Sequence, residues 1–299
     1  MRPRELWPLL KQAVSSWSSD YAPSMGAALS YYTLFSIAPL LIIVIAIAGF
    51  FFGDDAVRGE ISVQLNGLIG AEGARTVEQM LQSVSRPEEG IIAALVSFGV
   101  LALGATTVLN ELQNDLDRIW RSEAVKKAGG VKGFARSRLL SLTLILAIAF
   151  LLIVSLVFSA AISAIGKWWG AWFGGWELLA HAIDLLASFG LMTLLFAMIY
   201  KIVPRAHIRW HDVWVGAAVT AMLFAIGKVL IGLYLGRSGV ASGFGAAGSL
   251  VLLLVWVYYS AQIFLIGAEF TWVYAHEYGS RSEGAHDVAI PDGSAGEGA

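Results

Sequence analysis

Long apolar runs, far longer than those of a soluble core helix, dominate the pattern of hydrophobic and polar positions along the chain. A helix that crosses a bilayer needs about 20 mostly apolar residues, and six runs meet this requirement. Because the runs are long and unbroken, they predict helices rather than strands. The six predicted spans are Ala28–Phe52, Ile91–Asn110, Leu139–Ile165, Leu178–Val203, Asp212–Leu235 and Ala246–Tyr274.

Segments outside the spans also carry a helical pattern. In the N-terminal segment 1–27, apolar residues recur at helical spacing beside Arg4 and Lys11, which predicts an amphipathic helix on the inner membrane surface. These residues are Leu6, Leu10, Val14 and Trp17. The loop after the first span contains helical stretches over Val57–Ile69 and Ala71–Val84. The loop after the second span begins with a helical extension of that span, marked by Leu112, Leu116 and Ile119.

The pattern therefore predicts an all-α integral membrane protein. Its transmembrane domain is a bundle of six helices over residues 28–274, with short helices outside the membrane. The tail 275–299 is rich in glycine, serine and acidic residues, and we expect it to be disordered.

Composition supports the membrane class. Of 299 residues, 57% are hydrophobic and only 14% are charged, whereas a soluble domain carries about 25% charged residues. The mean hydropathy is +0.70. A soluble globular enzyme, a disordered chain and a nucleic-acid-binding protein with a basic face are therefore excluded. The chain has no cysteine, so disulfides, thiolate metal sites and cysteine nucleophiles are excluded as well.

The distribution of lysine and arginine predicts the orientation. With both termini inside, 14 of these residues fall in inner segments and 5 in outer loops, while Lys228 lies in a span. Because cytoplasmic loops carry the excess of positive charge, this favours both termini in the cytoplasm. Tryptophans at span ends fit interfacial anchoring, although the outer group also suits a partner surface. They are Trp168, Trp169, Trp172 and Trp176 outside, with Trp210 and Trp214 inside.

Three stretches of the chain resemble a known family. Residues 27–41 read AALSYYTLFSIAPLL, and residues 200–204 read YKIVP, followed by WHDVWVGA at 210–217. The third stretch begins with ASGFGAAGS at 241–249. It continues through WVYY at 256–259 to GAEF at 267–270. Together they resemble the YihY / virulence factor BrkB family of bacterial inner-membrane proteins, over about Asp20 to His276.

The resemblance implies a six-helix protein of the bacterial inner membrane whose biochemistry is not settled. Members have been linked to serum resistance and to envelope lipid phenotypes, which implies membrane lipids as partners and a lipid-like substrate. Some members carry a ribonuclease BN label. The tRNA-processing hydrolase of that name needs an HxHxDH zinc motif, and this chain lacks it. We therefore expect no ribonuclease activity and no nucleic-acid partner.

Ionisable residues inside a bilayer are costly and are functional candidates for that reason. Asp184 and Lys228 lie at matched depth, about 9 and 10 Å below the outer ends of their spans at about 1.5 Å per residue. Two arrangements are predicted for these residues. Either Asp184 and Lys228 form an ion pair, or the Lys228 side chain extends outward to the lipid head groups.

A second polar group is predicted near the inner leaflet. Tyr31, Asn110, Lys201 and Glu269 lie at similar depth by the same counting. Such a cluster would bind a head group or relay protons. The alternative is a satisfied polar network that only holds the helices together, because buried polar groups must find partners.

Two further motifs have a structural and a functional interpretation. Pro39 removes one helical hydrogen bond, freeing the carbonyl of Phe35, and so predicts a kink that is either a hinge or a packing feature.

His207 and His211 have a spacing that suits two metal ligands on a helix. No third ligand is evident nearby, so we predict no metal and interpret Asp212 as the N-cap of the fifth span.

Small residues in the fifth span favour close helix contacts, either within the chain or in a dimer. They are Ala217, Ala221 and Ala225, with the pair Gly232 and Gly236. The oligomeric state stays open.

The combined expectation is a multi-pass inner-membrane protein that transports or handles an amphipathic envelope substrate. The alternative is a non-transporting membrane scaffold or envelope-integrity protein. No nucleophile–base pair or metal constellation is evident in the sequence, so we expect neither an enzyme nor a cofactor.

Overall fold

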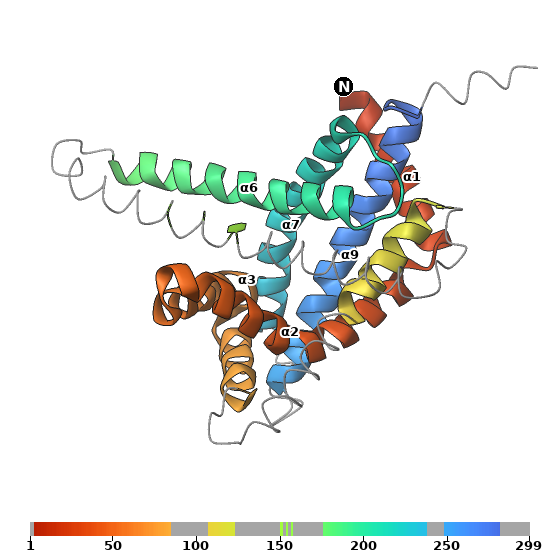
Figure 1. Ribbon diagram of the computed structural model, residues 1–299. Helices are drawn as coiled ribbons and strands as arrows, with labels where there is room; N and C mark the ends of the chain where they lie inside the picture. The colour runs from red at the N-terminus through yellow and green to blue at the C-terminus, as the bar shows by residue number, and fades with distance from the viewer. Residues whose placement is uncertain are drawn as a thin grey trace, which may run out of the picture.

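The computed structural model describes residues 3–84, 107–122, 150, 151, 154, 157, 176–237 and 248–281, and within them all regular secondary structure is helical. The all-α prediction is confirmed for this part of the chain. A helix also covers residues 107–119. The other helices are α1 Pro3–Ser19, α2 Ala22–Phe52, α3 Asp54–Val84, α6 Trp176–Ile202, α7 Trp210–Arg237 and α9 Gly248–Glu277 (Figure 1).

Four of the predicted spans correspond to helices of the structure, namely α2, α6, α7 and α9. Among the described residues, three helices are long and apolar enough to cross a membrane, in α6, α7 and α9. α2 makes a fourth if its segments Ala22–Ala38 and Leu40–Phe52 form one bent span. The predicted spans 91–110 and 139–165 lie outside the described residues apart from a few positions, so a count of six remains a prediction.

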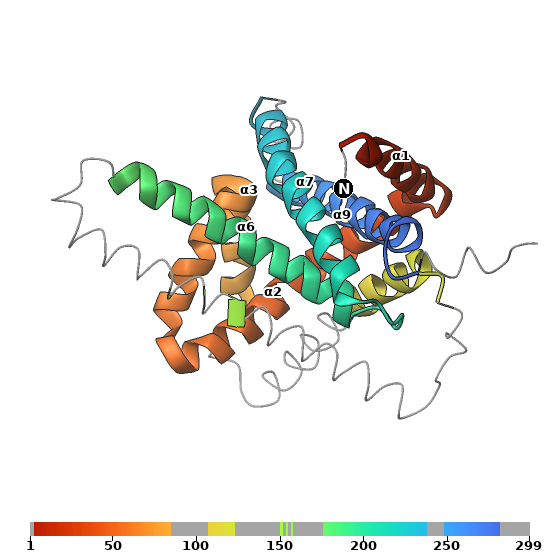
Figure 2. The same ribbon diagram turned by 90° about the horizontal axis from the view of Figure 1, so that it is seen from above.

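α9 lies at the centre of the described fold. It contacts α1, α2, α3 and α7, while α6 packs on the outer side of α7. Seen from above, α9 runs between α7 and α1 (Figure 2). Its buried side is apolar along most of its length, as shown by Leu253, Leu265 and Phe270, and this side forms the core against its neighbours.

α7 and α9 approach closely through two glycine–threonine contacts. A Cβ added at Gly216 of α7 would overlap the Thr271 side chain, and one added at Gly267 of α9 would overlap that of Thr220. Each threonine hydroxyl donates to the carbonyl four residues earlier, at 2.7 Å in both helices. Small residues at both positions let the backbones meet while the hydroxyls stay bonded within their own helices.

α1 packs on the end of α9. Leu9 and Ala13 are buried against Phe270, Val273 and Tyr274 of α9. The predicted amphipathic helix is therefore present, but the face that it buries contacts protein. Trp7 and Val14 lie on the exposed side of α1. Contact of that exposed side with the membrane surface stays a prediction.

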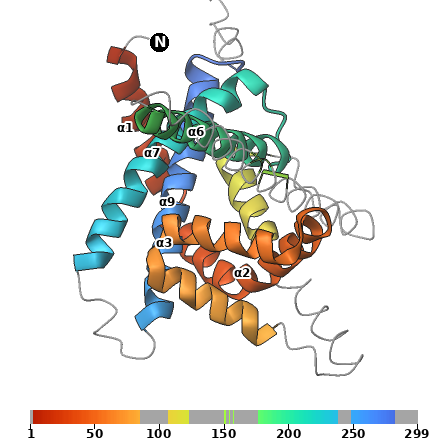
Figure 3. The ribbon, with the colours of Figure 1, turned by 90° about the vertical axis from the view of Figure 1, so that its left-hand side faces the viewer.

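α2 and α3 form the opposite corner of the molecule. The two segments of α2 meet at 44° around position 39, where the sequence has the proline expected to bend this helix. After a turn at Gly53, α3 folds back so that its two halves face each other (Figure 3). Ile61 and Val77 from these halves share an apolar cluster with Leu253 of α9. The two helical stretches predicted for this loop thus become the two halves of one bent helix.

Apolar side chains also cover much of the exposed surface. The exposed set includes Leu185, Leu186, Met222, Ile226, Val229, Leu230 and Leu233. Large apolar side chains exposed in this number on α6 and α7 are unfavourable in water and suit contact with lipid. The surface therefore agrees with the membrane class predicted by composition.

Candidate functional site

Glu269 is, together with Asp212, among the most deeply buried acidic residues of the described helices, and it forms the centre of the candidate site. It lies on α9 with 1% of its surface exposed. Its neighbours come from two other parts of the chain, the junction between α1 and α2 and the end of the helix 107–119. Apolar residues such as Met25 and Leu116 close the core around this region. A carboxyl group in such surroundings requires a partner or a proton.

Asp20 supplies the facing group. Its carboxyl lies within side-chain hydrogen-bonding reach of the Glu269 carboxyl, and the charge of Arg121 also acts on Glu269. The buried atoms Glu269 Oε1 and Asp20 Oδ2 have no hydrogen-bond partner among the described residues. Two carboxyl groups in this arrangement repel each other unless a proton or a cation lies between them. We call Asp20 and Glu269 the acid pair.

The backbone beside the acid pair is in an uncommon conformation at two positions. Tyr21 follows Asp20 with φ 59°, and Arg121 has φ 46°. The left-handed region costs a residue with a Cβ about 1 kcal/mol or more. Both residues that meet Glu269 therefore stand at or next to a left-handed residue. This geometry fixes the chain turns that bring Asp20 and Arg121 to α9.

A second polar contact ties the same corner to α9. Trp17 Nε1 donates to Gln262 Oε1 at 3.0 Å, and Gln262 lies two helical turns before Glu269. Gly26 of α2 leaves the space that the Gln262 amide occupies. Two polar residues of α9, Gln262 and Glu269, therefore face the junction between α1 and α2.

The helix 107–119 holds the loop between α6 and α7. Asp117 accepts a hydrogen bond from the Arg205 backbone N–H at 2.7 Å and lies 3.4 Å from the Arg205 guanidinium. Gln113 Nε2 donates to the Val203 carbonyl at 2.8 Å. These bonds satisfy buried polar groups and fix the helix that precedes Arg121 against the bundle.

Asp115 lies on the same helix, beyond the end of the second predicted span, and is almost fully buried. Burial raises its pKa to about 7, the nearby Glu111 charge adds to the increase, and Arg118 opposes it. Its Oδ2 atom has no hydrogen-bond partner among the described residues. Asp115 therefore exchanges a proton near neutral pH.

Positive side chains gather at this end of the molecule and lie over aromatic rings. The distances from the charged groups to the ring centroids lie between 4.4 and 5.9 Å. Such contacts contribute about 0.5–1 kcal/mol each where they are exposed. The four pairs are Arg118 with Tyr21, Arg121 with Trp272, Lys201 with Trp210 and Arg281 with Trp120. We call this region the basic end of the bundle.

Hydrogen bonds join the chain after α9 to the start of α7 at the basic end. Asp212 is buried and accepts hydrogen bonds from Ser280, including one from its hydroxyl at 2.6 Å. The N-cap interpretation of Asp212 was wrong, because α7 already begins at Trp210 and the carboxylate binds the chain after α9 instead. Bonded structure thus continues to residue 281, past the predicted end of the last span at 274.

For two residues of the predicted inner cluster, Lys201 and Tyr31, the structure gives other contacts. Lys201 Nζ donates to the Ile208 carbonyl. Tyr31 is exposed and contacts the rings of Tyr32 and Phe35. Asn110 is exposed on the helix 107–119. Glu269 remains a candidate, but the groups that meet it are Asp20 and Arg121.

Only one side chain of the predicted outer pair lies within the described residues. Lys228 is exposed on α7. The side chain of Asp184 lies outside the described residues, so its pairing with Lys228 stays a prediction. The N-terminal half of α6, which carries residue 184, diverges from α7 (Figures 1 and 2).

Sequence reasoning missed Asp20 and Arg121 because both were assigned to loops outside the membrane. The position of Asp20 directly before a helix start with proline, Ala22–Pro23, was a usable signal, since a turn there directs the chain back toward the bundle. No comparable signal points to Arg121 among the many basic residues of its loop.

No group of three or more histidine, aspartate or glutamate residues in the described segments is placed to hold a metal ion. His207 and His211 are both exposed. His211 Nδ1 lies 3.6 Å from Asp212, and the His207 carbonyl accepts a hydrogen bond from Arg281.

Comparison with known proteins places the chain among membrane proteins. The family described as "Virulence factor BrkB" matches residues 13–290. A "UPF0761 membrane protein" of Tolumonas auensis is 27% identical over 84% of this chain and 80% of its own length. One from Pseudomonas aeruginosa is 27% identical over 84% of this chain but only 58% of its own length. One from Acinetobacter baylyi is 24% identical over 92% of this chain and 64% of its own length. No solved structure matches the chain.

Proposed function

Because the chain belongs to the virulence factor BrkB family of membrane proteins, we propose that it transports an amphipathic, lipid-like envelope substrate across the bacterial inner membrane. The observation that carries the proposal is the acid pair where α9 meets the α1–α2 junction, with Glu269 buried and Asp20 half-buried. The proposal assigns no enzymatic step to the protein.

The charge balance of the site supports a proton-binding role. The groups around Glu269 are Asp20 and Arg121, two carboxyls and one guanidinium. One negative charge therefore remains uncompensated, and one proton shared by the acid pair neutralises it. Arg118 at the same corner faces the ring of Tyr21. Buried charges without compensation are strongly unfavourable in such surroundings.

The location of the acid pair supports coupling to a conformational change. A shared proton holds the α1–α2 junction against α9, and its loss places two carboxylates in repulsion. Asp20 lies next to the left-handed residue Tyr21, so the junction is the point at which α1 and α2 would separate from α9. Proton binding would then bias two arrangements of the bundle, as alternating access requires.

The distribution of apolar and basic residues on the surface supports the proposed location in the bacterial inner membrane. Apolar side chains of α6 and α7 are exposed, as expected for lipid contact. Arginine and lysine gather at the basic end, where α1 begins and α9 ends (Figure 1). An excess of positive charge marks the cytoplasmic side, which supports both termini facing the cytoplasm.

A non-transporting membrane scaffold is the second candidate function. It is favoured by the close packing of α7 on α9 through Gly216 and Gly267, because such contacts rigidify a helix pair. On that account Glu269 would only hold α9 to the α1–α2 junction.

Flux measurements on purified protein in liposomes separate the two functions. We expect the wild type to move a fluorescent phospholipid between leaflets with a rate that depends on pH. Glu269→Gln and Asp20→Asn keep the side-chain shapes but cannot exchange the proton, so flux should fall at least about tenfold, about 1.4 kcal/mol of activation free energy. The residual flux should no longer vary with pH.

Glu277→Gln is the matched control, because Glu277 lies on the same helix and is exposed. It should behave as the wild type. Size-exclusion profiles of all variants establish assembly, and Asp20→Asn keeps the test informative if Glu269→Gln fails to assemble. Wild-type flux no higher than in protein-free vesicles would contradict transport, and impaired assembly of both variants would favour the scaffold.

A further inference from the structure

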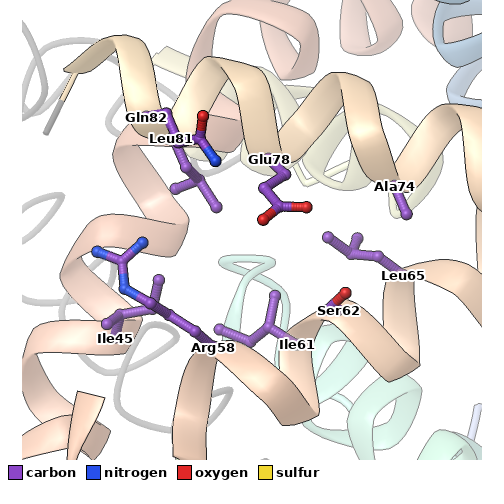
Figure 4. Close-up of a pocket in the computed structure, with 9 residues that line it drawn as sticks. All are labelled: Ile45, Arg58, Ile61, Ser62, Leu65, Ala74, Glu78, Leu81 and Gln82. Atoms are coloured by element: carbon purple, nitrogen blue, oxygen red, sulfur yellow. The ribbon is translucent and has the colours of Figure 1, made fainter. Parts of the chain in front are cut away.

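A cavity lies between the two halves of α3, away from the acid pair. Its volume is about 70 Å³. One water molecule needs roughly 10–15 Å³ by this measure, so the cavity holds several waters or one small head group. It opens to solvent between the halves, and Ile45 of α2 closes one side (Figure 4).

The lining of the cavity combines apolar side chains with one positively and one negatively charged side chain. Ile61, Leu65 and Leu81 contribute the apolar part. Both Arg58 from the first half of α3 and Glu78 from the second half line the cavity; the Glu78 carboxylate points into it, and the Arg58 guanidinium stands at its edge near Ile45 (Figure 4). Within the described residues no ion pair joins these two side chains. Both charges are therefore available to a bound molecule.

Two polar residues complete the lining. Ser62 stands on the same half as Arg58, and Gln82 on the same half as Glu78. A hydroxyl and an amide can each donate and accept hydrogen bonds. Each charged side chain thus has an uncharged hydrogen-bonding neighbour on its own half of the helix.

The cavity lies close to a surface that suits lipid. α2 ends with Phe50, Phe51 and Phe52, the first two of which expose 85% and 68% of their surfaces, and α3 begins at Asp54 after Gly53. Aromatic side chains exposed at the end of a membrane helix favour the membrane–water interface. The cavity is therefore placed near the level of lipid head groups at the end of α2.

The geometry points to a binding site for a zwitterion that joins a phosphate to a primary ammonium, the chemistry of a phosphoethanolamine head group. The Arg58 guanidinium donates paired hydrogen bonds to the phosphate. The Glu78 carboxylate accepts from the ammonium group. A ligand with both charges compensates both side chains at once.

Other head-group chemistries fit this lining less well. A purely anionic group would meet the repulsion of the Glu78 carboxylate. A quaternary ammonium is recognised by aromatic rings, and the nine lining residues include none. The site should therefore prefer phosphoethanolamine over phosphoglycerol and phosphocholine head groups.

Binding to the full-length protein in detergent tests the site. Isothermal titration with short-chain phosphatidylethanolamine, phosphatidylglycerol and phosphatidylcholine should show the ethanolamine lipid binding most tightly. Arg58→Gln and Glu78→Gln should each weaken that binding at least about fivefold, or about 1 kcal/mol. Glu78→Gln should also raise the relative affinity for phosphatidylglycerol, because the repelling charge is gone.

Free phosphoethanolamine distinguishes the two sources of this chemistry. Affinity equal to that of the short-chain lipid would assign the site to a soluble zwitterion, and much weaker affinity would assign it to a lipid. Arg75→Gln and Glu60→Gln are the charge-matched controls, since both lie on α3 but do not line the cavity. Equal binding of all three lipids, or unchanged binding by both cavity variants, would overturn the inference. Binding here does not depend on the acid pair, so it is tested separately from transport.

Discussion

At the residue scale, the buried carboxyl groups of this protein are compensated in different ways. Asp212 accepts hydrogen bonds from Ser280, and Asp117 binds the backbone and side chain of Arg205. Glu269 instead meets another acid, Asp20. Since a buried carboxyl that accepts hydrogen bonds has its partners while one that faces a second carboxyl does not, the first two are structural and the acid pair is the candidate for function.

Asp115 is a further buried carboxyl group, and its protonation should make the stability of the folded protein depend on pH. Its pKa of about 7 in the folded chain lies above the ordinary 3.8, so the folded state binds the proton more tightly. Its contribution to stability is full below about pH 4 and is lost as the pH rises to about 7, at up to about 1.4 kcal/mol per pH unit. Asp115→Asn should remove this loss, so that its Tm exceeds that of the wild type at pH about 8.

Thermal unfolding in detergent across this pH range measures the effect. Asp55→Asn is the control, since Asp55 is exposed at the start of α3. Parallel pH profiles for the wild type and Asp115→Asn would contradict the assignment.

At the element scale, the pair α7 and α9 organises the bundle. Gly216 faces Thr271, and Gly267 faces Thr220. Tyr200 of α6 joins this contact, because its hydroxyl donates to the Phe264 carbonyl at 2.7 Å. Glycine is needed at these two positions because the facing helix occupies the space of a side chain. The small-residue row predicted for the fifth span partly lies here, with Ala217 and Ala221 buried and Ala225 exposed.

Alanine at the two contact glycines should therefore destabilise the bundle. Gly216→Ala and Gly267→Ala each force the helices apart, and overpacking of this kind costs about 1–3 kcal/mol. Gly232→Ala on the same helix α7 meets no atom within 4 Å. It should instead stabilise the protein by up to about 1 kcal/mol, because alanine favours the helix.

Unfolding by titration with a denaturing detergent measures all three variants. A drop in stability for Gly232→Ala as large as that for Gly216→Ala would show that loss of glycine itself, and not the α7–α9 contact, is responsible.

At the scale of the whole molecule, the two ends differ in chemistry. The basic end gathers arginine and lysine over aromatic rings, together with the start of α1 and the end of α9. α3 and its cavity lie with the other end of α2. This polarity fits a protein inserted with α1 and the end of α9 inside and α3 outside.

Cysteine labelling tests that orientation directly, because the natural chain has no cysteine. Glu277→Cys marks the end of α9, and Gln79→Cys marks α3, both at exposed positions. In intact spheroplasts a membrane-impermeant maleimide should label Gln79→Cys and leave Glu277→Cys unlabelled until the membrane is broken. The reverse pattern would overturn the orientation.

The sequence by itself determined the class of the protein and the bounds of three of its described helices. The predicted spans 178–203, 212–235 and 246–274 match α6, α7 and α9 to within three residues at each end. The bend at Pro39 and the helix carrying Leu116 and Ile119 also follow from local pattern. These features depend on the length of apolar runs, on proline geometry and on helical spacing, which are written along the chain.

Only the tertiary structure decided which polar groups meet. Matched depth placed Lys201 near Glu269, but the order and rotation of the helices turn Lys201 toward Ile208. They bring Asp20 and Arg121 to Glu269 from segments about 250 and 150 residues away. Depth fixes one coordinate of a side chain, whereas a contact also requires its rotation about the helix and the neighbour on that side. Those are set by packing between helices, and the acid pair exists because of it.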